Sequence, residues 1–323
     1  MPDAPAPDFH HAPVMLAEVL AALGSATEGW VVDATVGGAG HAVALLDAHP
    51  GLSLLGLDQD PSALAAAGER LARFGPRART VRARFDALAE VVAAELDGAA
   101  VVGVLLDLGV SSPQLDRADR GFSYRLEAPL DMRMDPEGPM TAADVVNGYA
   151  EADLAHVLAI HGDERFAARI ARAIVSARPL RTTTELAAVV RDAIPAATRR
   201  RGGHPATRTF QALRIEVNRE LEVLPVALDA AVEVLRPGGR LAVLSYHSGE
   251  DRIVKRALRW HETGGCTCPP GLPCACGAVP ALRLLRRGGL TPTPAEVTAN
   301  PRAGSARLRV AERLPRPAPE EAP

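Results

Sequence analysis

The chain has 323 residues, of which 47% are hydrophobic, so it can form one large domain or two ordinary ones around a substantial core. Its net charge of −3 excludes a polycation that binds nucleic acid over its whole surface, and an RNA site would have to be a local basic patch. Because the sequence has neither an apolar run of membrane-spanning length nor the pattern of a secretory signal at its N-terminus, we expect a cytoplasmic protein.

Strands and helices alternate over the first hundred residues. Apolar runs and helical periodicity predict helices at 13–23, 42–49 and 61–74, and strands at the start of 30–41 and at 52–60, 79–88 and 101–109. Such alternation is typical of parallel βαβ units in a doubly wound sheet.

The alternation stops after the fourth strand. Residues 115–220 contain helical patterns, such as 151–178, and no convincing strand. A helix, a Pro-Gly-Gly turn and a strand follow at 227–248, and a last strand is predicted at 305–313. We therefore predict an α/β, Rossmann-like domain that is interrupted by an all-helical insertion. The predicted parts are 1–114 and 221–314 for the sheet domain, 115–220 for the insertion and 315–323 for a disordered tail.

Small and acidic residues follow the predicted strands at their carboxyl ends, where open α/β sheets bind ligands. The first strand leads into the glycine-rich turn 37–40, whose backbone N–H groups can approach a ligand closely. Asp58 ends the second strand, where a carboxylate can accept hydrogen bonds from both hydroxyls of a ribose. Phe85 follows the third strand and could pack on an adenine ring, and Asp107 ends the fourth. The alternative is a tight turn with acids that only cap helices.

The spacing of the glycines narrows the choice of cofactor. The dinucleotide fingerprint G-x-G-x-x-G lacks its third glycine here, because Gly40 is followed by His41, Ala42 and Val43. No lysine follows the turn as in a nucleotide-binding P-loop. These departures weaken the case for NAD and ATP and leave S-adenosylmethionine as the better candidate.

A polar turn, Ser111-Ser112-Pro113-Gln114, comes directly after the fourth strand. Pro113 fixes the turn and donates no hydrogen bond, so the carbonyls and hydroxyls of the two serines are predicted to point outward as acceptors. Acceptors aimed at the N–H bonds of an exocyclic ring amine would orient it for methylation, and Gln114 offers both a donor and an acceptor. The alternative is an ordinary serine-proline turn.

Seven segments together resemble the bacterial small-subunit ribosomal RNA cytosine-N4 methyltransferase family. They run in order along the chain: "HHAPVMLAEV" (10–19), "DATVGGAGH" (33–41), "LDLGVSSPQLD" (106–116), "RGFSYRLEAPLDMRMD" (120–135), "HPATRTFQALRIEVNREL" (204–221), "RPGGRLAVLSYHSGEDRIVK" (236–255) and "NPRAGSARLRVAER" (300–313). The resemblance implies that S-adenosylmethionine donates a methyl group to the N4 amine of a cytidine in the decoding region of the small-subunit RNA. It also implies that the helical insertion recognises the substrate.

The resemblance carries site residues with it. The implied cofactor contacts are Ala39, Gly40 and His41 in the turn, Asp58 at the ribose, Phe85 at the adenine, and Asp107 and Gln114 beside the transferred methyl group. Family members often have a glycine where this chain has Ala39. An alanine with a usable N–H serves there if its φ angle is negative. The turn also lacks the aromatic residue of other amino-methyltransferase motifs, so Phe122, Tyr124 or Tyr246 would have to stack on the target base.

Arginines gather in the stretch 198–220, although the whole chain is slightly acidic. Arginine suits phosphate contacts and stacking on bases, so we predict contacts to the small-subunit RNA or the assembling subunit. The predicted residues are Arg199, Arg200, Arg201, His204, Arg208, Arg214 and Asn218. The alternative is a solvated helix face, and the sequence leaves monomer and homodimer equally open.

The four cysteines form a C-x-C-x5-C-x-C pattern at Cys266, Cys268, Cys274 and Cys276. Four thiolates can hold a tetrahedral zinc ion, although the usual spacing is C-x2-4-C. In a cytosolic chain the pattern argues against a disulfide framework. A structural zinc site and four reduced loop thiols remain the two alternatives.

His247 follows the fifth predicted strand, at the same sheet edge as the acids, and could accept a proton or orient the substrate. A structural hydrogen bond is the alternative. Three rival functions also remain at this stage. They are a nicotinamide-dependent oxidoreductase, a non-catalytic RNA-binding or assembly factor, and a methyltransferase that acts on a small molecule.

Overall fold

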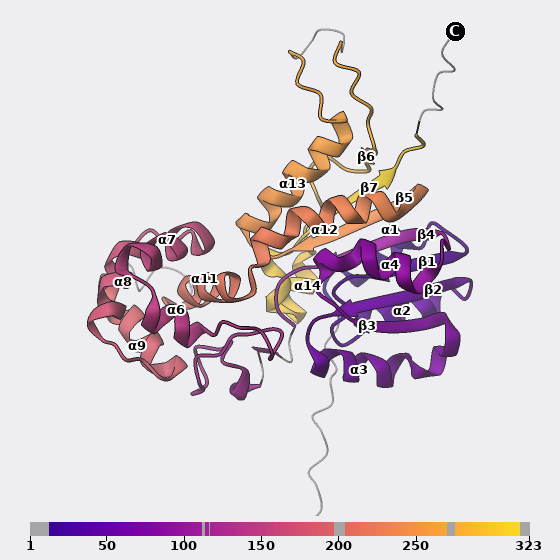
Figure 1. Ribbon diagram of the computed structural model, residues 1–323. Helices are drawn as coiled ribbons and strands as arrows, with labels where there is room; N and C mark the ends of the chain where they lie inside the picture. Colours follow the sequence, from indigo (N-terminus) through magenta and orange to yellow (C-terminus); the bar gives the residue numbers. More distant parts are fainter. Residues whose placement is uncertain (1–12, 112–113, 116, 197–203, 270–274, 317–323) are drawn as a thin grey trace, which may run out of the picture. The chain divides into compact units, whose positions relative to one another are not determined.

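The chain forms two compact units (Figure 1). The computed structural model describes residues 13–111, 114–115, 117–196, 204–269 and 275–316. The first unit comprises residues 1–109 and 224–323, and the second comprises residues 110–223.

A seven-stranded sheet forms the centre of the first unit, with strand order β3-β2-β1-β4-β5-β7-β6. The strands are β1 (Gly29–Asp33), β2 (Leu52–Asp58), β3 (Ala78–Arg82), β4 (Val101–Asp107), β5 (Leu235–Ser245), β6 (Leu282–Leu284) and β7 (Arg307–Arg313). Strands β1 to β5 are parallel, whereas β7 runs antiparallel to β5 and to β6. The predicted Rossmann-like α/β class is confirmed, and its last two strands make the sheet mixed.

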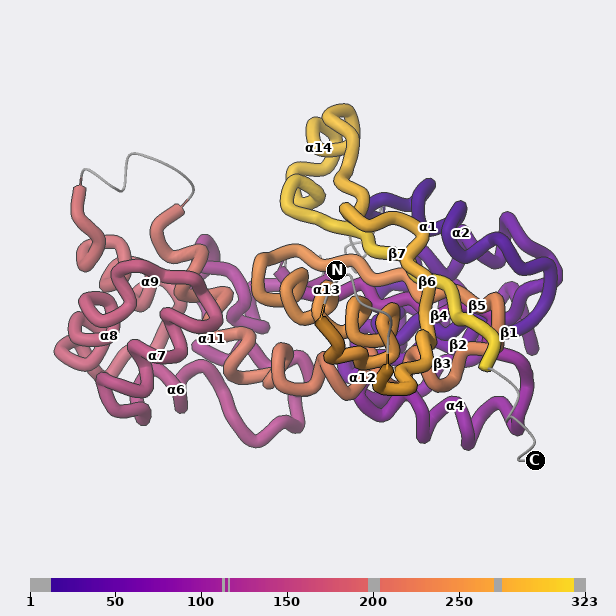
Figure 2. The backbone as a smooth tube through the Cα atoms, turned by 90° about the horizontal axis from the view of Figure 1, so that it is seen from above, coloured from indigo at the N-terminus to yellow at the C-terminus, as the bar shows by residue number. Residues whose placement is uncertain are grey.

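Helices cover both faces of this sheet because successive residues along each strand point to opposite sides. On β1, Val31 packs into the core of one face and Val32 into the core of the other; Leu54 and Leu55 divide in the same way on β2. Figure 2 shows α1 and α2 on one side of the strands and α4 and α12 on the other. The helices are α1 (Leu16–Leu23), α2 (Gly40–Ala48) and α3 (Pro61–Leu71) on the first face, and α4 (Leu88–Leu96), α12 (Glu220–Val234) and α13 (Ser248–Thr263) on the second.

Two local features differ from the predicted pattern. The third strand was expected to reach residue 88, but it ends at Arg82, and Phe85 begins a short 3-10 helix that leads into α4. A two-bond ion pair between Arg84 and Asp86 closes this turn. The Pro-Gly-Gly turn lies inside β5 as a bulge, because the pairing with β4 skips residues 236–239.

The second unit is helical in its described part, apart from an isolated bridge between Pro129 and Thr182. Its helices are α6 (Ala142–Gly148), α7 (Glu151–Gly162), α8 (Ala167–Ser176), α9 (Thr183–Ala193) and α11 (Thr207–Asn218). The long helical pattern at 151–178 divides into α7 and α8, because Asp163 adopts a left-handed conformation with φ 46°. Leu154, Ile170 and Leu213 contribute to a separate hydrophobic core.

None of the helices in the described part of the chain is both long and apolar enough to cross a bilayer.

Candidate functional site

Three carboxylates lie at the carboxyl ends of neighbouring parallel strands: Asp33 on β1, Asp58 on β2 and Asp107 on β4. Burial raises the pKa of Asp33 to about 7, and repulsion from Asp107 and Asp58 adds to the rise. Burial also raises the pKa of Asp58 to about 6 and raises that of Asp107. A cation bound at this edge of the sheet would therefore stabilise the ionised forms of these carboxylates.

Asp58 is well prepared to accept hydrogen bonds from a ligand. Its Oδ2 accepts a hydrogen bond of 2.9 Å from the N–H of Gly37, and its Oδ1 accepts one of 2.9 Å from the N–H of Asp60. The N–H of Gln59 also contributes a hydrogen bond to this carboxylate, so ribose hydroxyls would share its remaining acceptor capacity with the turn. The glycine turn and the ribose acid that the sequence predicts are thus joined by a direct contact.

The structure corrects the prediction for Ala39. Its φ angle is 58°, not negative, and the residue is fully buried at the start of α2. Its N–H donates to the carbonyl of Val36 at 2.7 Å, so this N–H closes the turn. Gly40 and His41, the first residues of α2, carry N–H groups that have no acceptor within the helix. The N–H groups of Gly40 and His41 are therefore better placed to bind a ligand than the N–H of Ala39.

The glycine turn depends on close packing beneath it. A Cβ at Gly56, in the middle of β2, would lie 2.9 Å from Cγ2 of Val36, the buried residue that leads into the turn. Gly56→Ala is therefore expected to lower the free energy of unfolding by about 1–3 kcal/mol and to weaken cofactor binding. Gly68→Ala is the matched control, because the space around Gly68 in α3 is open. Chemical denaturation of both variants checks this, and equal stability would contradict it.

Asp107 holds Tyr246, one of the three candidate aromatics. The Tyr246 hydroxyl donates to Oδ1 of Asp107 at 2.7 Å, and Oδ2 lies 3.5 Å from Nδ1 of His41. The other ring nitrogen of His41 lies 3.0 Å from the Val14 carbonyl, which can only accept, so Nε2 carries the proton. His41 and Asp107, both predicted from the sequence, therefore belong to one polar cluster with Tyr246.

Phe85, the predicted neighbour of adenine, is half-buried and packs against the core on the α4 side of the sheet. Phe122 is buried in the core of the second unit and has no free ring face for a base. Tyr124 also belongs to the second unit and is only partly buried. Of the two candidates in that unit, Tyr124 is therefore the one with part of its ring accessible to a ligand.

The polar turn after β4 is partly described, because Ser112 and Pro113 lie outside the described residues. The Ser111 N–H donates to Oε1 of Gln114 at 3.0 Å, and the Ser111 carbonyl accepts from the N–H of Leu115 at 3.3 Å. Gln114 is buried. The prediction of an outward-facing Ser111 carbonyl needs correction, since that oxygen already accepts one hydrogen bond within the turn.

In the described part of the basic stretch, His204 is exposed and takes part in an aromatic stack. The His204 ring stacks on Tyr124, with ring centroids 4.2 Å apart and an interplanar angle of 7°, and the Arg125 guanidinium lies 5.6 Å from the Tyr124 centroid. Partial burial, with the nearby Arg125 and Arg191, lowers the pKa of His204 and favours its neutral form. Arg208 is exposed and donates to the Asp163 carbonyl. Arg199, Arg200 and Arg201 lie outside the described residues.

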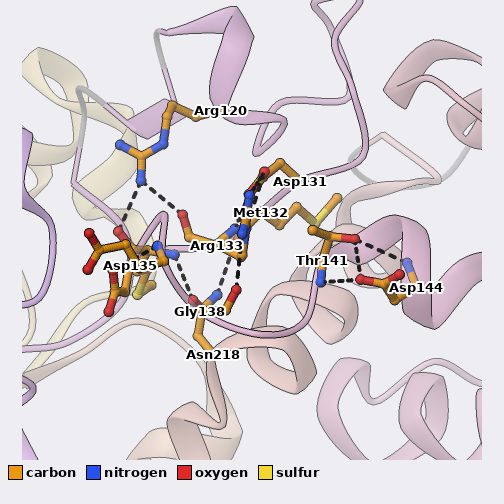
Figure 3. A network of polar contacts seen from close by, with 11 residues as sticks. Arg120, Asp131, Met132, Arg133, Asp135, Gly138, Thr141, Asp144 and Asn218 are labelled. Atoms are coloured by element: carbon orange, nitrogen blue, oxygen red, sulfur yellow. Dashed lines mark hydrogen bonds and ion pairs between the residues drawn. The ribbon is translucent and has the colours of Figure 1, made fainter.

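Arg214 and Asn218 have partners within the protein, and their contact with RNA stays a prediction. Arg214 makes a two-bond ion pair with Glu220 at 2.7 and 2.9 Å, and both side chains are largely buried. Asn218 accepts from the N–H of Met134 at 2.7 Å and donates to the Met132 carbonyl at 2.8 Å (Figure 3). These two side chains hold the end of α11 and the loop 131–135 in place.

The arginines of the 120–135 motif also bind within the protein. Arg120 donates to the carbonyls of Arg133 and Met134, and Arg133 makes a two-bond ion pair with Asp131 (Figure 3). Arg133 also donates to the carbonyl of Gly138. The motif thus builds a rigid loop, a role that the sequence alone did not reveal.

His247 caps α13. Its Nδ1 accepts from the N–H groups of Gly249 and Glu250 at 3.2 and 3.4 Å, while Nε2 lies 3.1 Å from Oε1 of Glu250 without the alignment of a hydrogen bond. The buried Glu250 accepts in turn from the N–H of Tyr246 at 2.7 Å. Because Nδ1 serves as an acceptor, the cap holds a neutral imidazole. A role in proton transfer stays a prediction.

Three of the four cysteines are described. The Sγ atoms of Cys266, Cys268 and Cys276 lie within 4.8 Å of one another. Cys274 lies outside the described residues.

The whole chain is similar to known methyltransferases. Ribosomal RNA small subunit methyltransferase H of Heliobacterium modesticaldum is 52% identical over 311 residues, covering 95% of this chain and 99% of that protein. The protein of the same name from Thermobifida fusca is 54% identical over 314 residues, covering 95% and 94%. Among solved structures, an rRNA methylase from Streptococcus thermophilus aligns over 93% of this chain and 94% of that chain, with 13% identity and a TM-score of 0.40.

The sequence profile of the MraW methylase family matches residues 8–314, nearly the whole chain. This match, together with identities above 50% to relatives over almost their whole length, assigns the chain to a family. The protein described here belongs to the MraW methylase family.

Proposed function

We propose that this protein transfers a methyl group from S-adenosylmethionine to the N4 amine of a cytidine in the decoding region of small-subunit ribosomal RNA. Relatives that match almost the whole chain bear the name ribosomal RNA small subunit methyltransferase H. The observation that carries the proposal in the structure is a set of three carboxylates with raised pKa values around a glycine-rich turn, the buried Asp33 and the partly buried Asp58 and Asp107.

The residues at this edge suit the cofactor. When bound, S-adenosylmethionine supplies a methyl group on a positively charged sulfur, and its amino acid part carries an ammonium group. Asp58 would accept hydrogen bonds from the ribose hydroxyls, while Asp33 and Asp107 would oppose the positive charge. Gly40 and His41 would contribute N–H groups to the turn. We keep Phe85 and Gln114 as proposed contacts to the adenine and near the methyl group.

The protein must also position a poor nucleophile. The lone pair of an exocyclic cytosine amine is delocalised into the ring, so hydrogen-bond acceptors that hold its N–H bonds favour attack. We propose that the hydroxyls of Ser111 and Ser112 serve this purpose, with Pro113 fixing the turn and Gln114 bracing it. The target nucleotide has to be splayed out to reach such a site.

The second unit is the proposed substrate-recognition domain. Its stack of the partly buried Tyr124 on the exposed His204, with Arg125 beside it and Arg208 on α11, combines an aromatic surface with positive charge. Proteins commonly bind unpaired RNA bases through this combination. The ligand would be the small-subunit RNA or the assembling subunit, which places the proposed activity in the cytoplasm. The described cysteines take no part in this chemistry, and a metal held by them would be structural.

Tyr124→Ala is expected to lower the affinity for small-subunit RNA by about 1–2 kcal/mol, or roughly 5- to 30-fold, because one stacking surface is lost. The affinity for S-adenosylmethionine should not change. Tyr124→Phe keeps the ring and is expected to bind RNA within about threefold of the original protein. Fluorescence anisotropy with labelled RNA measures both, and full affinity in the alanine variant would contradict the proposed RNA surface.

Deletion of the gene tests the proposed function in the cell. Mass spectrometry of digested small-subunit RNA should then show one N4-methylcytidine converted to a form lacking that methyl group. Expression of the original chain should restore it, and expression of Asp58→Ala should not. An unchanged RNA methylation pattern after deletion would instead favour a non-catalytic assembly factor.

A further inference from the structure

The loop that joins α13 to β6 brings three thiols together, although no buried side chain in the described part of the loop packs them there. We propose that Cys266, Cys268 and Cys276 bind a structural zinc ion, independently of methyl transfer. Their Sγ atoms all lie within 4.8 Å of one another. Zinc bound tetrahedrally at about 2.3 Å per sulfur needs sulfur atoms about 3.8 Å apart, so only a small adjustment is required.

The backbone at the two ends of the loop fixes this arrangement. Gly264 and Gly265 have φ angles of 62° and 73°, a conformation that favours glycine, and they turn the chain sharply after α13. A Cβ at Gly264 would lie 2.4 Å from the carbonyl carbon of Val279, so the backbone that leaves α13 lies against the backbone that returns to β6. The Ala281 N–H donates to the His261 carbonyl at 2.8 Å and closes the loop.

Backbone hydrogen bonds hold the ends of the loop, but its described part has no hydrophobic core of its own. Between Gly264 and Ala281 none of the described residues is buried, and Val279 is exposed. A segment without a core of its own is commonly stabilised by a metal or a covalent cross-link. Three thiolates on one zinc ion would connect the two sides of this loop, and each thiol would release its proton as the metal binds. The C-x-C pair at 266–268 and Cys276 come from opposite sides, as such a cross-link requires.

The metal content of the full chain tests the proposal. Protein purified under reducing conditions, without added zinc or chelator, should contain close to one zinc per chain by mass spectrometry. Cys266→Ser, Cys268→Ser and Cys276→Ser should each lose most of it. Thr267→Ser, in the same loop, is the matched control and should keep it. Wild-type protein without zinc, or zinc retained at full occupancy in all three cysteine variants, would overturn the proposal.

Two measurements keep the test valid if a variant folds poorly. Cobalt(II) added to reduced, metal-free wild-type protein should give the thiolate charge-transfer and tetrahedral d–d absorption bands. Trp260 offers a local signal, because a Cβ at Gly265 would lie 2.7 Å from its ring. In a Trp30→Phe background, where Trp260 is the remaining tryptophan, removing zinc should change its fluorescence. Absence of tetrahedral cobalt bands would count against the site.

Discussion

Asp58→Ala is expected to weaken the binding of S-adenosylmethionine by about 3–6 kcal/mol, a loss of roughly 150-fold or more. Each hydrogen bond from a ribose hydroxyl to a carboxylate contributes about 1.5–3 kcal/mol, and the variant loses both. It also removes the acceptor that the N–H groups of Gly37 and Asp60 use, so the turn loses support. Isothermal titration calorimetry with the cofactor alone measures the change.

Two further variants separate these effects. Asp58→Asn keeps the size of the side chain and one acceptor oxygen, so we expect an intermediate loss. Asp47→Ala removes an exposed acid on α2 that pairs with Arg73, and its cofactor affinity should match that of the original protein. Binding by Asp58→Ala within threefold of the original would mean that the cofactor lies elsewhere.

Asp33→Asn is expected to make the protein more stable and its cofactor binding weaker. The pKa of Asp33 rises from 3.8 to about 7 on folding, because the side chain is 3% exposed and faces two other carboxylates. The folded state therefore holds a proton that the unfolded state has lost between pH 4 and pH 7, so this group destabilises the fold as pH rises. The difference corresponds to an upper limit of roughly 4 kcal/mol above pH 7.

The stability gain should consequently depend on pH. We expect Asp33→Asn to be about 2–3 kcal/mol more stable than the original chain at pH 8 and nearly equal to it at pH 4. Loss of one negative charge should weaken cofactor binding about tenfold at pH 8. Urea unfolding at the two pH values and calorimetry of binding check both expectations. A variant that is no more stable at pH 8 would show that Asp33 ionises freely in the folded protein.

The alternation of strands and helices was sufficient to predict the first five strands, and Asp58 and Asp107 end two of them as expected, although the third strand ends earlier than predicted, at Arg82. Asp33 was missed. It ends β1 just as the other two acids end their strands, but the prediction for this segment used only the glycine-rich turn that follows it. The strand β6 was missed because three residues are too few to show a period.

Contacts between distant residues explain most of the remaining differences. Asn218 and Met134 are 84 positions apart, and neither residue carries a local sign that the asparagine holds a loop. Arg214, predicted as an RNA contact, makes a two-bond ion pair with Glu220 inside the second unit, which the sequence alone did not indicate. The left-handed conformation of Ala39 likewise follows from the tight turn around it and not from the residue type.

Methyl transfer by the purified protein tests the central claim most directly. Small subunits from a strain that lacks the gene would be incubated with the full chain and S-adenosylmethionine carrying a labelled methyl group, and the RNA digested to nucleosides for mass spectrometry. The account predicts that the label enters N4-methylcytidine at one position, and that Asp58→Ala reduces the rate strongly at limiting cofactor. Label on another atom or nucleoside, or no transfer by protein that binds the cofactor, would contradict it.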